Sequence, residues 1–290
     1  MISKYLNPKN DTAFKRIFGE ERNKDIVISL INSVLSDQLH RQIVDVEFLK
    51  TEQVPHVAAA KKSSVDIACK DQDGCRYIIE MQVAKEAGFE KRAQYYASKA
   101  YIDQMPNGGK WKDLKEVIFL AFADYRIFDE KEHYKSEHVT LDRNTLERNL
   151  KGFSFTFINM PKFMEKYQDS IPGNLEEKFY YFLSKADELT AEQVEELVKS
   201  EKVLQRAFNE LDIINWPDEK RRAYEEVENI ERSYRSNIDD AKEEGEKIGI
   251  EKGEKIGIEK GEKIGRQKAI QEMVEQGIVT QEQADAMLKK

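Results

Sequence analysis

Two acids and one amide lie in stretches that otherwise have the composition of β-strands. Glu80 and Gln82 interrupt the apolar run YIIEMQV at 77–83, and Asp66 lies within SVDIAC at 64–69. Because side chains alternate along a strand, Glu80 and Gln82 share one face. An unpaired buried carboxylate is costly, so a bound cation would explain why acids stand among apolar neighbours.

The two runs flank a turn signal, Asp73–Gly74, and therefore predict a β-hairpin formed by 64–69 and 75–83. In that hairpin Asp66 falls opposite or nearly opposite Glu80, with Cβ atoms about 5 Å apart. Two carboxylates this close repel each other unless one takes a proton or a metal ion lies between them. Oxygen ligands suit Mg²⁺ or Mn²⁺, and a water on such an ion can attack a phosphodiester. The alternative is that both acids are strand-edge residues that point to solvent.

The surrounding pattern predicts an α/β fold with a mixed sheet. Apolar residues at three- and four-residue spacing predict helices over 8–35 and 87–105. Strand-like runs follow at 43–49, 116–123 and 152–160. The run at 116–123 is apolar throughout, which is typical of a strand covered on both faces. The helix at 87–105 is therefore predicted to cross over between parallel strands.

The C-terminal part is predicted to be helical from about residue 174 and contains a glycine-punctuated repeat. EEGEKIGI, EKGEKIGI and EKGEKIGR follow one another over 243–266. Each glycine inside a helix costs about 1 kcal/mol relative to alanine, yet small residues also let two helices approach closely. The repeat is thus either a helix that forms a homo-oligomer or a charged, solvated stalk. The predicted division is a core at 1–170, a helical region at 171–240, the repeat at 241–268 and a short helical pair at 269–290.

Composition indicates a soluble, charge-rich protein. Apolar residues make up 40% of the chain and charged residues 35%. No apolar run is long enough for a membrane span, and the N-terminus lacks a signal-peptide pattern. The two cysteines, Cys69 and Cys75, form neither a disulfide framework nor a CxxC pair, so we expect a reducing, cytoplasmic location.

The net charge of −8 argues against a nucleic-acid partner. The charge is uneven, however: residues 1–125 carry +1 and the remainder −9, which leaves the first part able to present a basic face to DNA.

The order of these elements resembles that of the PD-(D/E)xK nuclease superfamily. More narrowly, the chain resembles the Rpn family of recombination-promoting nucleases, also described as PD-(D/E)xK-family transposases. The resemblance spans most of residues 5–275 and rests on NDTAFKRIFG, VDIACKDQDGCRYIIEMQ, KRAQYYASKAY, WKDLKEVIFLAF, FINMPKF and the glycine-punctuated tail. It implies a restriction-endonuclease-like mixed sheet flanked by helices. It also implies divalent-metal-dependent hydrolysis of DNA phosphodiester bonds, which would promote recombination or transposition-like events.

The resemblance also implies residue roles. Asp66 matches the metal-binding aspartate and Glu80 the acidic residue of the (D/E)xK element. Gln82 stands where most of the superfamily has a lysine that polarises the attacking water, and Val65 stands in place of the proline of the PD element. Asp11, near the start of the first helix, matches an acidic residue that related enzymes often carry close to the metal. Its alternative role is that of a helix N-cap or first-turn carboxylate.

Four basic residues are candidates for contacts with DNA phosphates. Lys61 and Lys62 precede the Asp66 strand, although a solvated loop pair explains them equally well. Lys85 follows the ExQ strand and can stand in for the missing lysine, and Arg92 opens the next helix.

Two functions follow from this pattern. The first is a Mg²⁺-dependent DNA endonuclease in which Asp66 and Glu80 bind the metal and Gln82 positions the water. The second is a catalytically degenerate nuclease-fold protein that binds DNA or protein and oligomerises through its tail. The intact Asp66 and Glu80 pair favours the enzyme.

Overall fold

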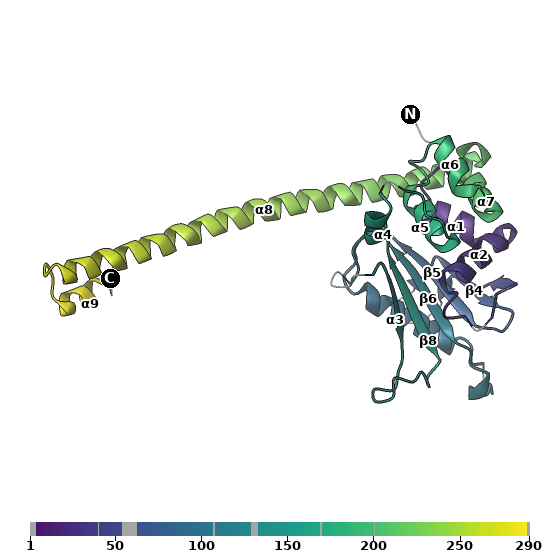
Figure 1. Ribbon diagram of the computed structural model, residues 1–290, viewed down its shortest axis with the longest axis horizontal. Helices are drawn as coiled ribbons and strands as arrows, with labels where there is room; N and C mark the ends of the chain where they lie inside the picture. The colour runs from purple at the N-terminus through teal and green to yellow at the C-terminus, as the bar shows by residue number, and fades with distance from the viewer. Residues whose placement is uncertain are drawn as a thin grey trace. The chain divides into compact units, whose positions relative to one another are not determined.

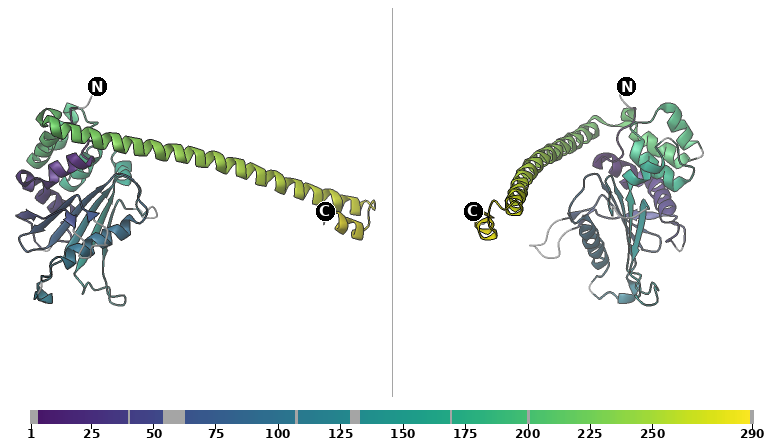
Figure 2. Two further views of the ribbon diagram at one scale, coloured as in Figure 1. Left: turned by 180° about the vertical axis from the view of Figure 1, so that it is seen from behind. Right: turned by 60° about the vertical axis from the view of Figure 1, so that its left-hand side comes forward.

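The computed structural model describes residues 4–39, 41–53, 63–106, 108–128, 133–168, 170–199 and 201–288. By their internal contacts they form two compact units, Met1–Glu228 and Asn229–Lys290. Figure 1 labels the elements, and Figure 2 shows them from two further directions.

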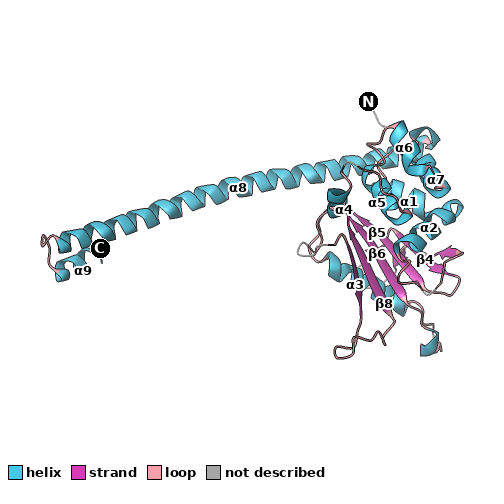
Figure 3. Ribbon diagram, in the orientation of Figure 1, coloured by secondary structure: helices cyan, strands magenta, loops and turns pink. Residues whose placement is uncertain are grey.

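The first unit is built on a six-stranded mixed sheet (Figure 3). Its strands, in spatial order, are β1 (Val46–Phe48), β4 (Ile67–Asp71), β5 (Arg76–Gln82), β6 (Val117–Ala123), β8 (Phe153–Asn159) and β7 (Lys135–Val139). β5, β6 and β8 are parallel, and the other neighbouring pairs are antiparallel. Two short strands, β2 (Glu52–Gln53) and β3 (Ser63–Ser64), pair with each other separately.

Helices cover both faces of the sheet (Figure 2). α3 (Phe89–Ile102) packs on one face, against β6. The helices that share the core of the other face are α1 (Asp11–Gly19), α2 (Lys24–Val34), α4 (Met160–Lys166), α5 (Leu175–Lys185), α6 (Ala191–Val198) and α7 (Lys202–Leu211). Short 3-10 helices lie at Glu21–Asn23, Trp111–Asp113 and Ile213–Asn215.

β5 shows how the sheet divides the core. Tyr77, Ile79 and Met81 join the larger core on the α1 face, whereas Ile78 joins the smaller core under α3. Glu80 has the same parity as Ile78, so the strand directs its side chain to the α3 face. β6 is buried along its whole length, as expected of a strand that is covered on both sides.

The predicted hairpin and crossover are confirmed. β4 and β5 pair as a hairpin, and α3 connects the parallel strands β5 and β6. The predicted helical character of 8–35 is confirmed over most of that range, but it is divided, because α1 ends at Gly19 and a 3-10 turn separates it from α2. At this break Glu20 is extended (φ −91°, ψ 139°). The buried Asn23 side chain donates a hydrogen bond to the carbonyl oxygen of Arg16 at 2.9 Å, which satisfies a group that the end of α1 leaves open.

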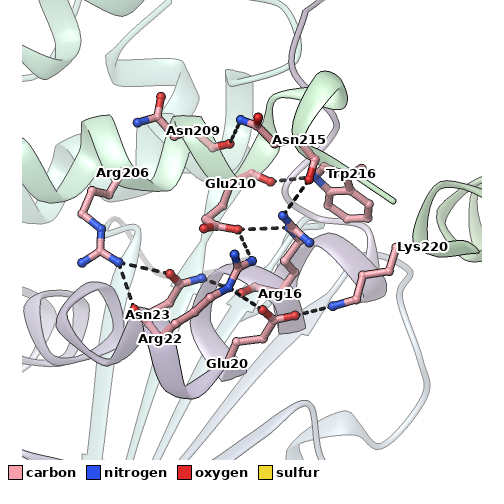
Figure 4. Close-up of polar contacts among 10 residues, drawn as sticks. All are labelled: Arg16, Glu20, Arg22, Asn23, Arg206, Asn209, Glu210, Asn215, Trp216 and Lys220. Atoms are coloured by element: carbon pink, nitrogen blue, oxygen red, sulfur yellow. Dashed lines mark hydrogen bonds and ion pairs between the residues drawn. The ribbon is translucent and has the colours of Figure 1, made fainter. Parts of the chain in front are cut away.

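A buried arginine joins α1 to α7 and the turn after it (Figure 4). Arg16 is 6% exposed, and its Nε lies 3.0 Å from Oε2 of Glu210. Nη2 of Arg16 donates to the carbonyl oxygen of Asn215 at 3.2 Å, and the guanidinium lies 4.8 Å from the ring centroid of Trp216. Arg22 reaches the same Glu210 oxygen at 2.6 Å. These contacts fix α1 to helices that follow it by almost 200 residues.

The C-terminal part contains α8 (Asp218–Glu275) and α9 (Gln281–Leu288). α8 is continuous through the whole glycine repeat. Nothing lies within 4 Å of the position that a Cβ would take at any of the six repeat glycines, and the repeat isoleucines are exposed. Among the helices of the described residues, α8 included, none combines the length and apolar character that a membrane crossing requires.

Candidate active site

Asp66 and Glu80 lie opposite each other on the β4–β5 hairpin. The register pairs Ile67 with Ile79, so the next pair along the antiparallel ladder is Asp66 with Glu80. Oε1 of Glu80 accepts a hydrogen bond from the backbone N–H of Asp66 at 3.1 Å. Oδ2 of Asp66 accepts one from the backbone N–H of Met81 at 2.8 Å. Each carboxylate is therefore anchored to the other strand, in the cross-strand placement that the sequence predicts.

The environment of the two acids disfavours their charged forms. Glu80 is 4% exposed, and its burial, followed by the charge of Asp66, raises the pKa of its carboxyl. Burial also raises the pKa of Asp66, although the N–H of Met81 opposes this effect. A cation beside both groups would favour their ionised forms again, and acids perturbed in this way are frequent at functional sites.

The donor set fits a hard divalent ion. Each carboxylate uses one oxygen for a backbone N–H, which leaves Oδ1 of Asp66 and Oε2 of Glu80 without a protein donor among the described residues. Mg²⁺ is commonly held by one or two carboxylates and keeps several waters. In the described part of the chain, no three His, Cys, Asp or Glu side chains are grouped so as to hold an ion. The protein therefore offers two acidic ligands, with the rest of the coordination left to water and substrate.

Gln82 is held at both ends of its amide. Oε1 accepts a hydrogen bond from Nη2 of Arg92 at 2.5 Å, and Nε2 donates to the carbonyl oxygen of Ala84 at 2.8 Å. Gln82 and Glu80 share one face of β5, so this contact places Arg92 near the acid pair, and its positive charge opposes the rise that burial causes in the pKa of both acids. The structure thus brings Arg92 to the site, with Gln82 as its partner.

Asp11 lies in the first turn of α1, a helix that contacts β4. Asn10 is the N-cap of that helix and accepts a hydrogen bond from the N–H of Thr12 at 3.0 Å. Asp11 forms an ion pair with Lys15 at 2.7 Å. Burial is the main cause of the raised pKa of Asp66; the charge of Asp11 adds to this rise and that of Lys15 opposes it. A catalytic role for Asp11 stays a prediction.

Of the three other predicted phosphate contacts, the structure describes only Lys85. Lys85 is exposed in the connection between β5 and α3, and its contact with a phosphate stays a prediction. Lys61 and Lys62 lie outside the described residues.

Two tyrosines that the sequence did not assign to the site border it. The ring centroid of Tyr96 lies 5.8 Å from Cζ of Arg92. Tyr125 follows β6, and its buried hydroxyl has no hydrogen-bond partner among the described residues. Burial raises the pKa of Tyr125 to about 12, and the charge of Arg92 opposes this. Parallel pairing brings the end of β6 beside the end of β5, where the N–H of Asp124 donates to the carbonyl of Gln82 at 2.9 Å. The predicted parallel pairing was therefore the one sequence signal that pointed to Tyr125.

A mixed sheet flanked by helices, with an acidic hairpin leading into a crossover helix, is a restriction-endonuclease-like α/β fold. The family model of the PD-(D/E)XK nuclease family transposases matches residues 8–241, and the chain belongs to that family. Its resemblance to these nucleases, drawn from the sequence, is thereby confirmed, and nucleases of this kind generally use divalent metal ions. No curated protein and no solved structure matches the chain.

Proposed function

We propose that the protein is a divalent-metal-dependent DNA endonuclease that uses Mg²⁺ or Mn²⁺ to hydrolyse phosphodiester bonds. The observation that carries this proposal is the reciprocally anchored pair formed by the half-buried Asp66 and the buried Glu80. Membership of a nuclease family of transposases supports both the reaction and DNA as the substrate.

Asp66 and Glu80 would hold the ion through their remaining oxygens. When bound, the ion would stabilise negative charge on the phosphoryl group and lower the pKa of a water. In the reaction the oxygen of a water bonds to phosphorus and one P–O ester bond breaks. A proton leaves the water, and the departing oxygen takes one up, so that one water is consumed per bond. The backbone N–H groups that anchor Asp66 and Glu80 keep both carboxylates oriented through this step.

DNA breakage of this kind would promote recombination or transposition-like events. The exposed isoleucines and open glycines of the α8 repeat support a homo-oligomer, and two sites in a dimer would suit the cutting of both strands.

A plasmid assay tests the proposal. Purified protein is incubated with supercoiled plasmid in Mg²⁺, Mn²⁺ or EDTA, alongside the variants Asp66→Asn, Glu80→Gln and Glu47→Gln. Glu47 is a matched control because it is an exposed acid on β1 that pairs with Lys70 at 2.9 Å. We expect cutting that requires the metal and falls by about 100-fold or more in the Asp66 and Glu80 variants, whereas Glu47→Gln cuts like the wild type.

Two outcomes would contradict the proposal. Equal cutting by wild type and both site variants would place the activity elsewhere. DNA binding without any cutting would support the alternative, a catalytically degenerate module that binds DNA or protein.

A further inference from the structure

The centre of the candidate site holds two acids, and the ExQ motif supplies no basic side chain. Asp66 and Glu80 lie opposite each other on the β4–β5 hairpin. Position 82 holds a neutral glutamine. A DNA phosphate that approaches this site adds further negative charge, and still more develops during hydrolysis, so a protein cation at the site would stabilise the reaction.

Arg92 is placed to supply that charge. It lies in the first turns of α3, and Gln82 fixes its Nη2 at 2.5 Å. Its guanidinium lies 4.9 Å from the ring centroid of Phe89 and 5.8 Å from that of Tyr96. Glu86 accepts from Nη1. These contacts orient the planar group, and its charge acts on both Asp66 and Glu80.

Arg92 also has N–H donors for which the described residues provide no acceptor. A guanidinium has five N–H donors, and the described contacts use one on Nη1 and one on Nη2. Its Nε is buried and has no acceptor among the described residues. The side chain is 25% exposed, so it remains within reach of a ligand that enters from solvent.

The lysines near the site are less suited to this task. Lys15 has its ammonium 2.7 Å from Oδ1 and 2.9 Å from Oδ2 of Asp11. Lys85 is exposed, beyond the end of β5. Neither has the fixed fork of donors with which an arginine binds a phosphate.

We infer that Arg92 is the cation that the ExQ motif lacks: it donates to an oxygen of the scissile phosphate, and Gln82 positions its guanidinium. This inference rests on the proposed function and adds a substrate-binding residue to it. Glu86 then has a second role, because it occupies Nη1 of Arg92 and competes with the phosphate for it. Glu86 is 48% exposed, so it can give way at little cost.

The test compares variants that separate charge from structure. Arg92→Met removes the charge but keeps a long apolar stem against Phe89 and Tyr96. Glu86→Ala removes the ion pair and leaves the charge. Lys91→Ala is the matched control, because Lys91 is the neighbouring exposed cation on α3. Arg92→Lys and the double variant Arg92→Met/Gln82→Lys each put a positive charge back.

Three quantities are measured for each full-length variant: the single-turnover cleavage rate with Mg²⁺, the DNA dissociation constant in EDTA as a function of salt, and the melting temperature. For Arg92→Met we expect a rate about 100-fold lower, a salt slope of binding that falls by about 1, and a melting temperature close to that of the wild type. Glu86→Ala should cut at least as fast as the wild type, and Lys91→Ala should cut equally fast. At least one of the two charge-restoring variants should recover tenfold or more of the lost rate.

The inference is overturned if Arg92→Met cuts like the wild type, or if Glu86→Ala loses as much rate as Arg92→Met, since the ion pair alone would then matter. Failure of both charge-restoring variants overturns it as well. A wild-type protein that cuts no DNA contradicts the proposed function itself. That result differs from the outcomes above, in all of which the wild type cuts DNA and the variants are compared with it.

Discussion

The carboxylate of Glu80 accepts a hydrogen bond from the backbone N–H of Asp66 at 3.1 Å, across the β4–β5 hairpin. Asp66 returns the interaction through the N–H of Met81 at 2.8 Å. The spacing of the two acids is thus set by strand register rather than by flexible side chains alone. Because a slip of one residue reverses the face of every side chain, the pairing that builds the hairpin also builds the site.

The first prediction concerns stability as a function of pH. Burial raises the pKa of Glu80 from its ordinary value of 4.5. Below that value the folded and unfolded states both hold the proton. As the pH rises, the unfolded state releases the proton first, so the free energy of unfolding of the metal-free protein falls until the raised pKa is passed. Glu80→Gln removes this loss and should be more stable than the wild type at pH 8 to 9 by at least about 1.4 kcal/mol, the equivalent of one pKa unit.

Urea denaturation of both proteins in EDTA, from pH 4 to pH 9, measures this difference. The glutamine retains an oxygen that can accept from the N–H of Asp66, so the hydrogen bond is kept. The two stability curves should meet near pH 4. If the free energy of unfolding of the wild type exceeded that of Glu80→Gln at every pH, the buried carboxylate would be ionised and stabilising without a metal.

The second prediction is that a divalent ion stabilises the folded protein. At 100 times its dissociation constant, Mg²⁺ or Mn²⁺ should add about 2.7 kcal/mol to the free energy of unfolding. The gain should be larger at pH 8 than at pH 6, because the ion must displace protons from Asp66 and Glu80. Thermal melts with and without the ion measure it. Equal stabilisation of the wild type and of Asp66→Asn would place the ion at another site.

The third prediction separates two arginines that share one acceptor. Arg16 is buried and Arg22 is about half exposed, and both contact Oε2 of Glu210. Arg16→Ala leaves Glu210, which is only 15% exposed, without its buried partner and should cost about 3 kcal/mol. Arg22→Ala should cost at most about 1 kcal/mol, since exposed ion pairs contribute little. Chemical denaturation of the two variants gives the comparison, and equal costs would mean that burial of the Arg16 contact is energetically irrelevant.

The fourth prediction concerns the glycines of the α8 repeat. A Cβ at Gly253 or Gly257 would meet nothing within 4 Å, so alanine at each should stabilise the helix by about 1 kcal/mol. Hydrogen exchange of the full-length protein should show slower exchange around both positions. Gly277→Ala is the contrasting variant, because φ at Gly277 is +71° and alanine there is strained. Faster exchange in the repeat alanines would contradict this prediction. Loss of self-association in sedimentation would place these glycines at the contact of the proposed homo-oligomer.

The sequence predicted the features that local patterns control. Strand alternation and the Asp73–Gly74 turn located the hairpin, and alternation also placed Asp66 opposite Glu80. The apolar run of β6 predicted a strand covered on both faces. These inferences succeeded because each depends on the spacing of residues within one short segment.

Features that depend on tertiary contacts could not be predicted from local sequence patterns. β7 (KSEHV) was not predicted because it is a polar, partly exposed edge strand that pairs only with β8. The break after α1 depends on the buried side chain of Asn23. The contact of Arg92 with Gln82 joins two elements whose approach no local pattern encodes, and for that reason the sequence alone assigned the water-positioning role to Gln82 by analogy.

The eight-residue period of the α8 repeat has a geometric consequence. Eight residues of α-helix rise about 12 Å and turn about 80° beyond two full turns. The repeat of eight residues over two turns corresponds to about four residues per turn, which exceeds the roughly 3.6 of an α-helix. Equivalent isoleucines such as Ile248, Ile256 and Ile264 therefore follow a right-handed spiral around the helix axis. Inserting one octapeptide would move everything beyond it about 12 Å forward and about 80° around the axis, and deleting one would move it back by the same amounts. The number of octapeptides therefore sets both a distance and an angle.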